Sequence, residues 1–256
     1  MKSNSSIYEH FRGNEQLVKR VFDLVDRMQR SYQVVYTPFL TPTQQEVCIR
    51  MLGQQISYQL CGGYEQAESR CLILIPDYMD ETAVKVPIHC LKATYVSKFH
   101  TLQHRDVLGA IMNMGLRREQ FGDILVQDTH IYIFVMEDIT SYVIANLTKI
   151  GRHSIQFSVC DQMVERVDTI YYREVIVSSL RLDAIVASMC QVSRSKAQAL
   201  ILGKLVKVHH LVLEDCALVC NNNSTISIRG YGRFLFTEVK KMTRNGRYVI
   251  EIGKYE

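Results

Sequence analysis

The chain has 256 residues, of which 47% are hydrophobic and 22% are charged, with only 13 Gly and 4 Pro. This composition excludes a disordered or collagen-like chain and indicates real hydrophobic cores in one to three domains. The 30 basic and 26 acidic side chains leave a net charge of only +4. The chain has no apolar run of about 18 residues and no apolar leader, so we expect a cytoplasmic protein without a membrane span.

The first segment, residues 1–76, is predicted to be a small α/β domain without recognisable chemistry. Apolar side chains recur at helical spacing after Asn14, which is a possible N-cap. Thr41 and Pro42 supply an N-cap and a first-turn proline for a second helix. The expected elements are helices over 17–28 and from 42 toward 53, and strands over 56–60 and 71–75.

The second segment, residues 77–160, is predicted to be a ferredoxin-like domain. Its pattern gives strand, helix, two strands, helix and strand, the βαββαβ order that many RNA-recognition domains share. The expected strands cover 88–95, 124–126, 130–136 and 154–159, and the expected helices cover 104–114 and 139–147.

Two aromatic residues of this segment, Tyr132 and Phe134, alternate with apolar residues on one predicted strand. They therefore share one face of the sheet, where aromatic rings can stack on bases. The same two rings could instead pack beneath a neighbouring domain. The Arg-Gly pair expected before that strand in an RNA-recognition motif is missing, and both interpretations stay open.

The charge is distributed unevenly along the chain. Residues 181–256 hold 12 basic and 6 acidic residues, a net charge of +6, whereas the first 180 residues hold 18 and 20, a net charge of −2. A basic module on a near-neutral body favours a polyanionic partner, because phosphate contacts release condensed counterions.

The basic module begins with two predicted helices, after a linker expected at residues 161–180. Asp183 is expected to cap the first helix, whose apolar stripe includes Ile185 and Met189. Ser193 is expected to cap the second. Free N–H groups at such a helix start attract phosphate, and neighbouring hydroxyl and guanidinium groups extend the site.

This helix–helix–strand pattern resembles the S4-type (αL) RNA-binding domain, over about residues 181–236. His209-His210 departs from the pattern where an Asn-Gly-like turn is usual, and Asn222-Asn223-Ser224 departs where Gly-Asp is common. The matching motifs are Arg181-Leu182-Asp183, Ser193-Arg194-Ser195-x-Ala197, Gly203-x-x-Val206-x-Val208 and Ile226-Ser227-Ile228-Arg229-Gly230.

The whole chain also resembles the YlmH family. The resemblance implies a bacterial cytoplasmic protein with a ferredoxin-like middle domain and an S4-type C-terminal domain. It implies structured RNA as the ligand, with ribosome association during rescue of stalled translation, and Arg181 and Arg194 as the main phosphate contacts. The motifs are His104-Arg105-Asp106-x-Leu108-Gly109, Gly122-Asp123-Ile124, Asn146-Leu147-x-Lys149-x-Gly151-Arg152, Arg229-Gly230-Tyr231-Gly232-Arg233-Phe234 and Thr243-Arg244-x-Gly246-Arg247.

Enzyme classes fit the sequence poorly. The His104-Arg105-Asp106 tripeptide lacks the other parts of a kinase catalytic loop. The Arg-Leu-Asp of pseudouridine synthases recurs at 181–183, but without a catalytic sheet domain around it. The sequence lacks the Gly-rich loop that a methyltransferase needs after its first strand. It also lacks the nucleotide-binding domain that a tRNA synthetase needs. We therefore expect no catalytic residues and no cofactor.

The eight cysteines are expected to be free and mostly buried, because the chain is long and carries no export signal. Two groups approach the spacing of a metal site, Cys216 and Cys220 near the His209-His210 pair, and Cys90 with His100 and His104. Their irregular spacing leads us to expect no metal.

The sequence therefore predicts a non-catalytic α+β protein that binds structured RNA, either ribosomal RNA or tRNA, through an S4-type domain with a basic tail at residues 181–256. The large ribosomal subunit is the expected partner, and no DNA specificity is expected. The alternative is an adaptor that contacts division proteins through its body. The predicted RNA-binding residues are Arg181, Ser193, Arg194, Ser195, Lys196, Gln198, Lys204, Lys207, Arg229, Arg233, Arg244 and Arg247.

Overall fold

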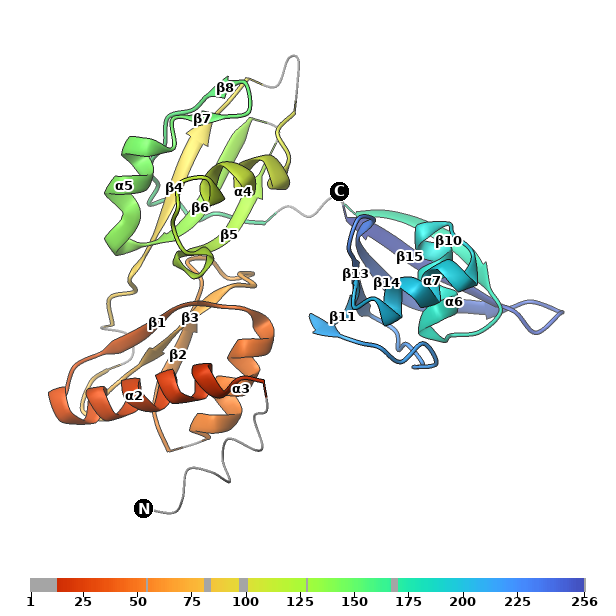
Figure 1. Cartoon of the computed structure of the whole chain (residues 1–256), viewed down its shortest axis with the longest axis horizontal. Helices are drawn as coiled ribbons and strands as arrows, with labels where there is room; N and C mark the ends of the chain where they lie inside the picture. The colour runs from red at the N-terminus through yellow and green to blue at the C-terminus, as the bar shows by residue number, and fades with distance from the viewer. Residues whose placement is uncertain are drawn as a thin grey trace. The chain divides into compact units, whose positions relative to one another are not determined.

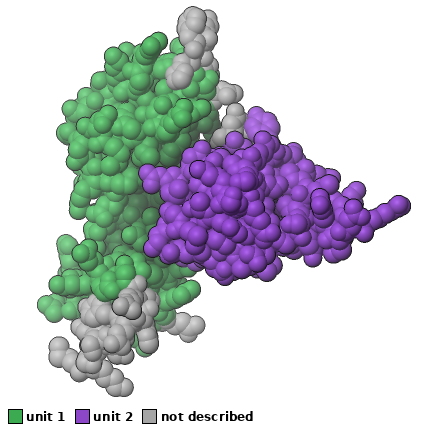
Figure 2. All heavy atoms as spheres, turned by 45° about the vertical axis from the view of Figure 1, so that its right-hand side comes forward, with its two compact units in different colours: residues 1–166 green, residues 167–256 purple. Residues whose placement is uncertain are grey.

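The chain folds into two compact units, residues 1–166 and 167–256 (Figures 1 and 2). Each unit mixes helices with antiparallel sheets, which confirms the predicted α+β class. In the part of the chain that the structure covers, no helix is long and apolar enough to cross a membrane. The computed structural model describes residues 13–53, 55–80, 84–96, 101–127, 129–166 and 170–255.

The first part of unit 1 is a three-stranded sheet of order β1-β3-β2 with two helices. Thr41 caps α3 as predicted, since its hydroxyl accepts from Gln44 N and the Gln44 side chain accepts from Thr41 N. Strand β1 was not predicted, because Pro38 interrupts its pattern, and the structure absorbs it in a register shift between Tyr36 and Phe39. The elements are α2 (Glu15–Ser31), β1 (Val35–Leu40), α3 (Pro42–Leu52), β2 (Tyr58–Cys61) and β3 (Arg70–Leu74).

The second part of unit 1 is a four-stranded antiparallel sheet of order β5-β6-β4-β9. With its chain order βαββαβ, this arrangement confirms the predicted ferredoxin-like topology. The elements are β4 (Ile88–Thr94), α4 (His104–Met112), β5 (Phe121–Val126), β6 (His130–Met136), α5 (Thr140–Asn146) and β9 (Ser158–Val159).

The last predicted strand of this sheet, 154–159, is wrong in extent. Of these six residues, only the two in β9 pair with β4. The residues before β9 include a small hairpin of β7 (Lys149–Ile150) and β8 (His153–Ser154). Gly151 supplies the positive φ of +57° that this tight turn needs, so the chain reverses where a continuous strand was expected.

The two parts of unit 1 share a core. Phe39 of β1 and Cys71 of β3 are buried in the same cluster as Phe121 of β5. Gly122 is required at this junction, because a Cβ there would lie 2.5 Å from the Phe39 ring. A separate domain boundary at residue 76 therefore remains a proposal within one compact unit.

Unit 2 is a six-stranded sheet of order β10-β15-β14-β13-β11-β12. Helices α6 and α7 lie on one face of it (Figure 1), and the buried stripes of both helices match the predicted ones. The elements are β10 (Ile170–Val177), α6 (Leu182–Cys190), α7 (Arg194–Leu202), β11 (Val206–Val208), β12 (Leu211–Val212), β13 (Ser224–Ile228), β14 (Gly232–Met242) and β15 (Tyr248–Tyr255).

Two predictions about the edges of this unit are wrong. Residues 170–177, expected within a linker, form β10 and pair along the whole of β15. The residues expected to form a basic tail instead form the end of the β14–β15 hairpin, which projects beyond the sheet in Figure 1. In both places the apolar periodicity is weak, because consecutive residues of these strand segments, and so both of their faces, are exposed or only half-buried.

The hairpin between β11 and β12 turns at His209 and His210. Their φ values are +47° and +68°, so both occupy the left-handed region of a type I′ turn. The two histidines therefore adopt the conformation that Asn-Gly favours. Side chains with a Cβ pay a strain energy in this region.

Replacing the pair by Asn-Gly (His209→Asn with His210→Gly) is expected to raise the free energy of unfolding by about 1 kcal/mol, because the strain is relieved. Urea denaturation of the full chain measures the change. Asn223→Gly is the matched control, since Asn223 also has a positive φ of +61° but tolerates it well. A double variant that is less stable than the parent would contradict this account of the turn.

Candidate nucleic-acid interface

Asp183 is the centre of a charged cluster at the start of α6. Arg194 donates from Nε to Oδ2 and from Nη2 to Oδ1 of Asp183, each at 3.0 Å. Gln198 donates to Oδ2 at 2.9 Å, and Arg181 donates from Nε and Nη2 at 3.3 and 3.2 Å. The carboxylate is fully buried and receives five hydrogen bonds. We call these four residues the Asp183 cluster.

This arrangement corrects the predicted helix start. Arg181, not Asp183, is the N-cap residue of α6, and Asp183 lies in the first turn. Its carboxylate is drawn away from the helix N-terminus because Arg194 and Gln198 offer it charge-assisted hydrogen bonds from α7. Ser193 caps α7 as predicted, accepting from Lys196 N.

The electrostatics of the cluster keep it charged. Burial alone would raise the pKa of Asp183, but the hydrogen bonds from Arg194, Gln198 and Arg181 hold the pKa of this carboxyl well below its usual range. The Asp183 carboxylate in turn raises the pKa of Arg194. Two guanidinium ions thus share one carboxylate, and the cluster has a net charge of +1.

The two arginine side chains remain accessible to a ligand. The side chain of Arg181 is 41% exposed and that of Arg194 is 47% exposed. Because the N–H of Nε and one N–H of Nη2 of each guanidinium bind Asp183, Nη1 and the second N–H of Nη2 are the donors that each can offer to an anion. Both side chains are held in place before a ligand arrives, which lowers the entropic cost of binding.

The structure brings half of the predicted residues together at these helix starts. Arg181, Arg194 and Gln198 meet at Asp183, and the Ser193 and Ser195 hydroxyls lie 3.0 Å apart in the exposed first turn of α7, which also carries Lys196. Hydroxyl, ammonium and guanidinium donors at a helix N-terminus are suited to phosphate oxygens.

Arg244 and Arg247 lie at the tip of the β14–β15 hairpin, and both are exposed. Tyr248, the first residue after this tip, pairs with Val177, and Arg181 follows Val177 by four residues. The backbone can span at most about 14 Å in that distance. The end of β15 next to the tip is therefore close to Arg181 of the Asp183 cluster.

The remaining predicted residues lie elsewhere in unit 2. Arg229 and Arg233 flank the turn where β14 begins, about 30 Å along that strand from Arg244. Lys204 follows α7 and pairs with Glu214 at 3.1 Å. Lys207 is on the sheet face opposite the helices, since its neighbours Val206 and Val208 are buried beneath them. The twelve residues are thus not a single site.

The aromatic pair of the middle sheet is mostly covered. Phe134 is fully buried and stacks on Tyr64, with 4.7 Å between ring centroids. Gly63 lies on the same ring, since a Cβ there would be 2.5 Å from it. Phe134 therefore packs beneath the first segment, which confirms that interpretation for this residue and excludes base stacking by it. Tyr132 is half-buried with Lys92 5.6 Å from its centroid.

A second polar cluster joins the two parts of unit 1. Asp123 of β5 accepts from Tyr64 Oη at 2.8 Å and from the backbone N–H groups of Glu68 and Ser69 at 2.7 and 3.0 Å. Glu68 in turn pairs with Arg166 at 2.6 Å. These groups satisfy one another, so the Gly122-Asp123 motif holds the 64–69 loop against the middle sheet.

The cysteines offer no metal site among the described residues. All eight are free as predicted, but only three are buried and five are half-buried, which corrects the expectation that most are buried. Burial raises the pKa of Cys220 to about 11 and that of Cys90 to about 12, so both thiols stay protonated. His100, considered with Cys90, lies outside the described residues.

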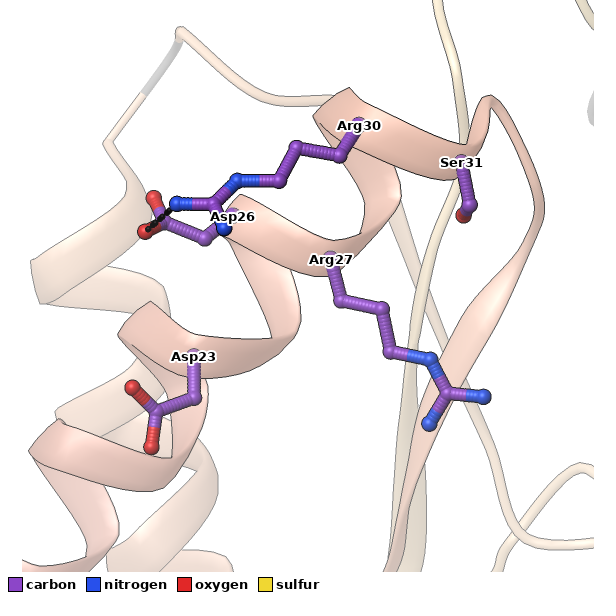
Figure 3. Close-up of a pocket in the computed structure, with 5 residues that line it drawn as sticks. All are labelled: Asp23, Asp26, Arg27, Arg30 and Ser31. Carbon is purple, nitrogen blue, oxygen red and sulfur yellow. Dashed lines mark hydrogen bonds and ion pairs between the residues drawn. The ribbon is translucent and has the colours of Figure 1, made fainter.

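A pocket on α2 is formed only by side chains of that helix (Figure 3). Arg30 and Asp26 within it form an exposed ion pair of 3.4 Å, one helical turn apart. Such a pair is typical of a solvated helix face. We assign it no function. The residues drawn are Asp23, Asp26, Arg27, Arg30 and Ser31.

Comparison with known proteins identifies both parts of unit 1. The family model "YlmH, N-terminal" matches residues 13–79, and "Putative RNA-binding domain in YlmH" matches residues 84–163. "Ribosome-associated protein quality control protein P2" of Bacillus subtilis (strain 168) is 34% identical over 249 residues, which are 95% of this chain and 96% of the relative.

A solved structure, "Cell division protein ylmH from Streptococcus pneumoniae", is 24% identical to this chain. It matches with a TM-score of 0.51 and covers 58% of this chain and 92% of that one. At this identity the match bears on the fold alone.

Proposed function

Because the chain belongs to the YlmH family, as its 34% identity over 95% of its length establishes, we propose that it is a non-catalytic RNA-binding protein that associates with the ribosome in translation quality control. The proposed ligand is structured RNA, either ribosomal RNA or tRNA. The proposed partner is the large ribosomal subunit, in the cytoplasm. The name of the Bacillus subtilis relative supports the ribosome association.

The observation that carries this proposal is the Asp183 cluster. A lone surface arginine loses rotational freedom when it binds phosphate, but Arg181 and Arg194 are already fixed by a buried carboxylate. Their spacing is set by one side chain, which favours a phosphate backbone of defined geometry over a diffuse polyanion. We place the main RNA contact here, with Ser193, Ser195, Lys196 and Gln198 beside it.

The tip of the β14–β15 hairpin extends this proposed site. Arg244 and Arg247 are exposed on the turn that joins β14 to β15 and projects beyond the paired strands, where cations can follow the RNA backbone beyond the reach of α7. Among the residues that the structure describes, no ion pair neutralises this tip in the way that Glu238 and Glu251 neutralise Lys240 further along the strands.

Two other assignments compete with this one. The family model places a putative RNA-binding domain at residues 84–163, where Lys92 and Tyr132 are only half-buried, so the middle sheet is the alternative RNA contact. The adaptor role in division rests on a structural neighbour whose likeness concerns the fold alone. RNA binding is therefore the function that the observations favour.

Sedimentation of the full chain with ribosomal subunits, followed by crosslinking in cells and sequencing of the bound RNA, tests the proposal. We expect the protein to sediment with the large subunit and the crosslinked RNA to be ribosomal RNA and tRNA. Recovery of messenger RNA alone, or of no RNA, would overturn the proposed function.

A further inference from the structure

A row of basic, hydroxyl and aromatic side chains crosses the sheet of unit 2 on the face opposite α6 and α7. Lys207 pairs with Ser227, and Ser227 pairs with Arg233. The guanidinium of Arg233 lies 4.8 Å from the ring centroid of Tyr255. These four residues, from β11, β13, β14 and β15, are called the sheet-face row.

Beside this row, next to the half-buried Tyr255, lies the exposed ring of Tyr172. Tyr172 of β10 pairs with Gly253, and this residue is 54% exposed. A Cβ on Gly253 would lie 3.1 Å from the Tyr172 ring and 2.5 Å from Ile170, so only glycine leaves room for the ring to lie over β15. The other side of the ring is open to solvent.

The row end of this face carries no carboxylate of its own among the paired residues, whereas acidic residues gather at the other end. Further along the same strands, Glu251 lies opposite Glu174 and Glu238. Lys240 pairs with Glu238 at 2.7 Å and with Glu251 at 3.1 Å. A polyanion would therefore be attracted to the sheet-face row and repelled by the neighbouring part of the sheet.

We propose that the sheet-face row and Tyr172 bind unpaired RNA nucleotides, as a contact separate from the Asp183 cluster. Bases stack on Tyr172 and Tyr255, while Lys207 and Arg233 attract the phosphates between them. Exposed rings favour a single strand, because the bases of a duplex have no free faces. The inference rests on the proposed function only in taking RNA as the ligand.

Binding of the full chain to a short oligouridine and to a base-paired RNA hairpin, whose loop is replaced by a non-nucleotide linker so that it offers no unpaired base, tests this inference when measured by fluorescence anisotropy. Tyr172→Ala with Tyr255→Ala should weaken oligouridine binding by about tenfold for each stacked base lost and leave hairpin binding unchanged. The variant Tyr172→Phe with Tyr255→Phe should bind like the parent, because stacking needs the ring and not the hydroxyl.

Tyr171→Ala is the matched control, because Tyr171 is 59% exposed on the same strand but points to the face that the helices cover. It should bind oligouridine like the parent. If the double alanine variant loses its fold, crosslinking of thiouridine-containing RNA to the parent chain decides, with crosslinks expected in β10 and β15. Equal binding by the double alanine variant, equal loss in the control, or crosslinks elsewhere would overturn the inference.

The two proposals fail in different ways. If an Arg194→Ala variant loses hairpin binding while the tyrosine variants change nothing, the proposed function stands and the sheet-face contact is wrong. If the tyrosine variants lose oligouridine binding while Arg194→Ala binds the hairpin like the parent, the reverse holds.

Discussion

Asp183→Ala is expected to lower the free energy of unfolding of unit 2 by about 3 kcal/mol. The substitution leaves two guanidinium ions and the Gln198 amide without the carboxylate that binds all three. The loss lies at the lower end of the range for broken buried pairs, because both arginines are partly exposed and regain water. Urea denaturation of the full chain, followed by hydrogen exchange at α6 and α7, measures it.

Glu214→Ala is the matched control, since it breaks the Lys204–Glu214 pair, in which both side chains are more than half exposed. An exposed pair contributes little, so this variant should differ from the parent by less than about 1 kcal/mol. Equal effects of the two substitutions would mean that the Asp183 carboxylate is not structurally important.

The same carboxylate makes unit 2 sensitive to acid. The pKa of Asp183 is lower in the folded chain than the value of about 3.9 in an unfolded one, so its stabilisation is complete above that value. The stabilisation is lost as the pH falls below about 4 toward the folded-state pKa. Asp183→Asn should therefore flatten the acid limb of stability against pH. An unchanged limb would assign it to other carboxyl groups.

Arg181→Ala and Arg194→Ala are each expected to weaken binding to ribosomal RNA about tenfold and to reduce the slope of log affinity against log salt by about one, the amount for one lost phosphate contact. Both substitutions also disturb Asp183. Lys196→Ala is therefore measured beside them, because its ammonium takes no part in the Asp183 cluster and its loss tests charge without affecting the fold.

Arg50→Ala serves as the control for net charge. Arg50 is an exposed residue of α3, and its side chain is 76% exposed, so its removal changes the charge of the chain equally but should leave RNA affinity unchanged. If Arg181→Ala and Arg194→Ala bind RNA like Arg50→Ala, the proposed site is wrong even if the protein binds RNA elsewhere.

The sequence predicted those parts of the fold in which a local signal agrees with the tertiary structure. The Thr41 cap, the Ser193 cap and the extent of β6 each depend on neighbours within a few residues, and the structure confirms them. Strands β1 and β10 were missed for different reasons. A proline interrupts β1, and exposed tyrosines on β10 weaken its apolar pattern.

The candidate site was predicted as a set of residues but not as a geometry. Arg194 and Gln198, four residues apart, were expected to share a face, and they do. Their partner, Asp183, is on another helix, so sequence spacing along one helix could not identify it. An Arg-x-Asp motif followed by an Arg-x-x-x-Gln motif is the signal that could have indicated a shared carboxylate.

Identifying the peptides of the full chain that crosslink to the RNA of the large ribosomal subunit tests the central claim most directly. We predict crosslinked peptides around Arg181, in the first turn of α7, and at Arg244 and Arg247 of the hairpin tip. Crosslinks confined to residues 84–163, the segment that the family model marks as RNA-binding, would contradict the claim that the Asp183 cluster is the main RNA contact.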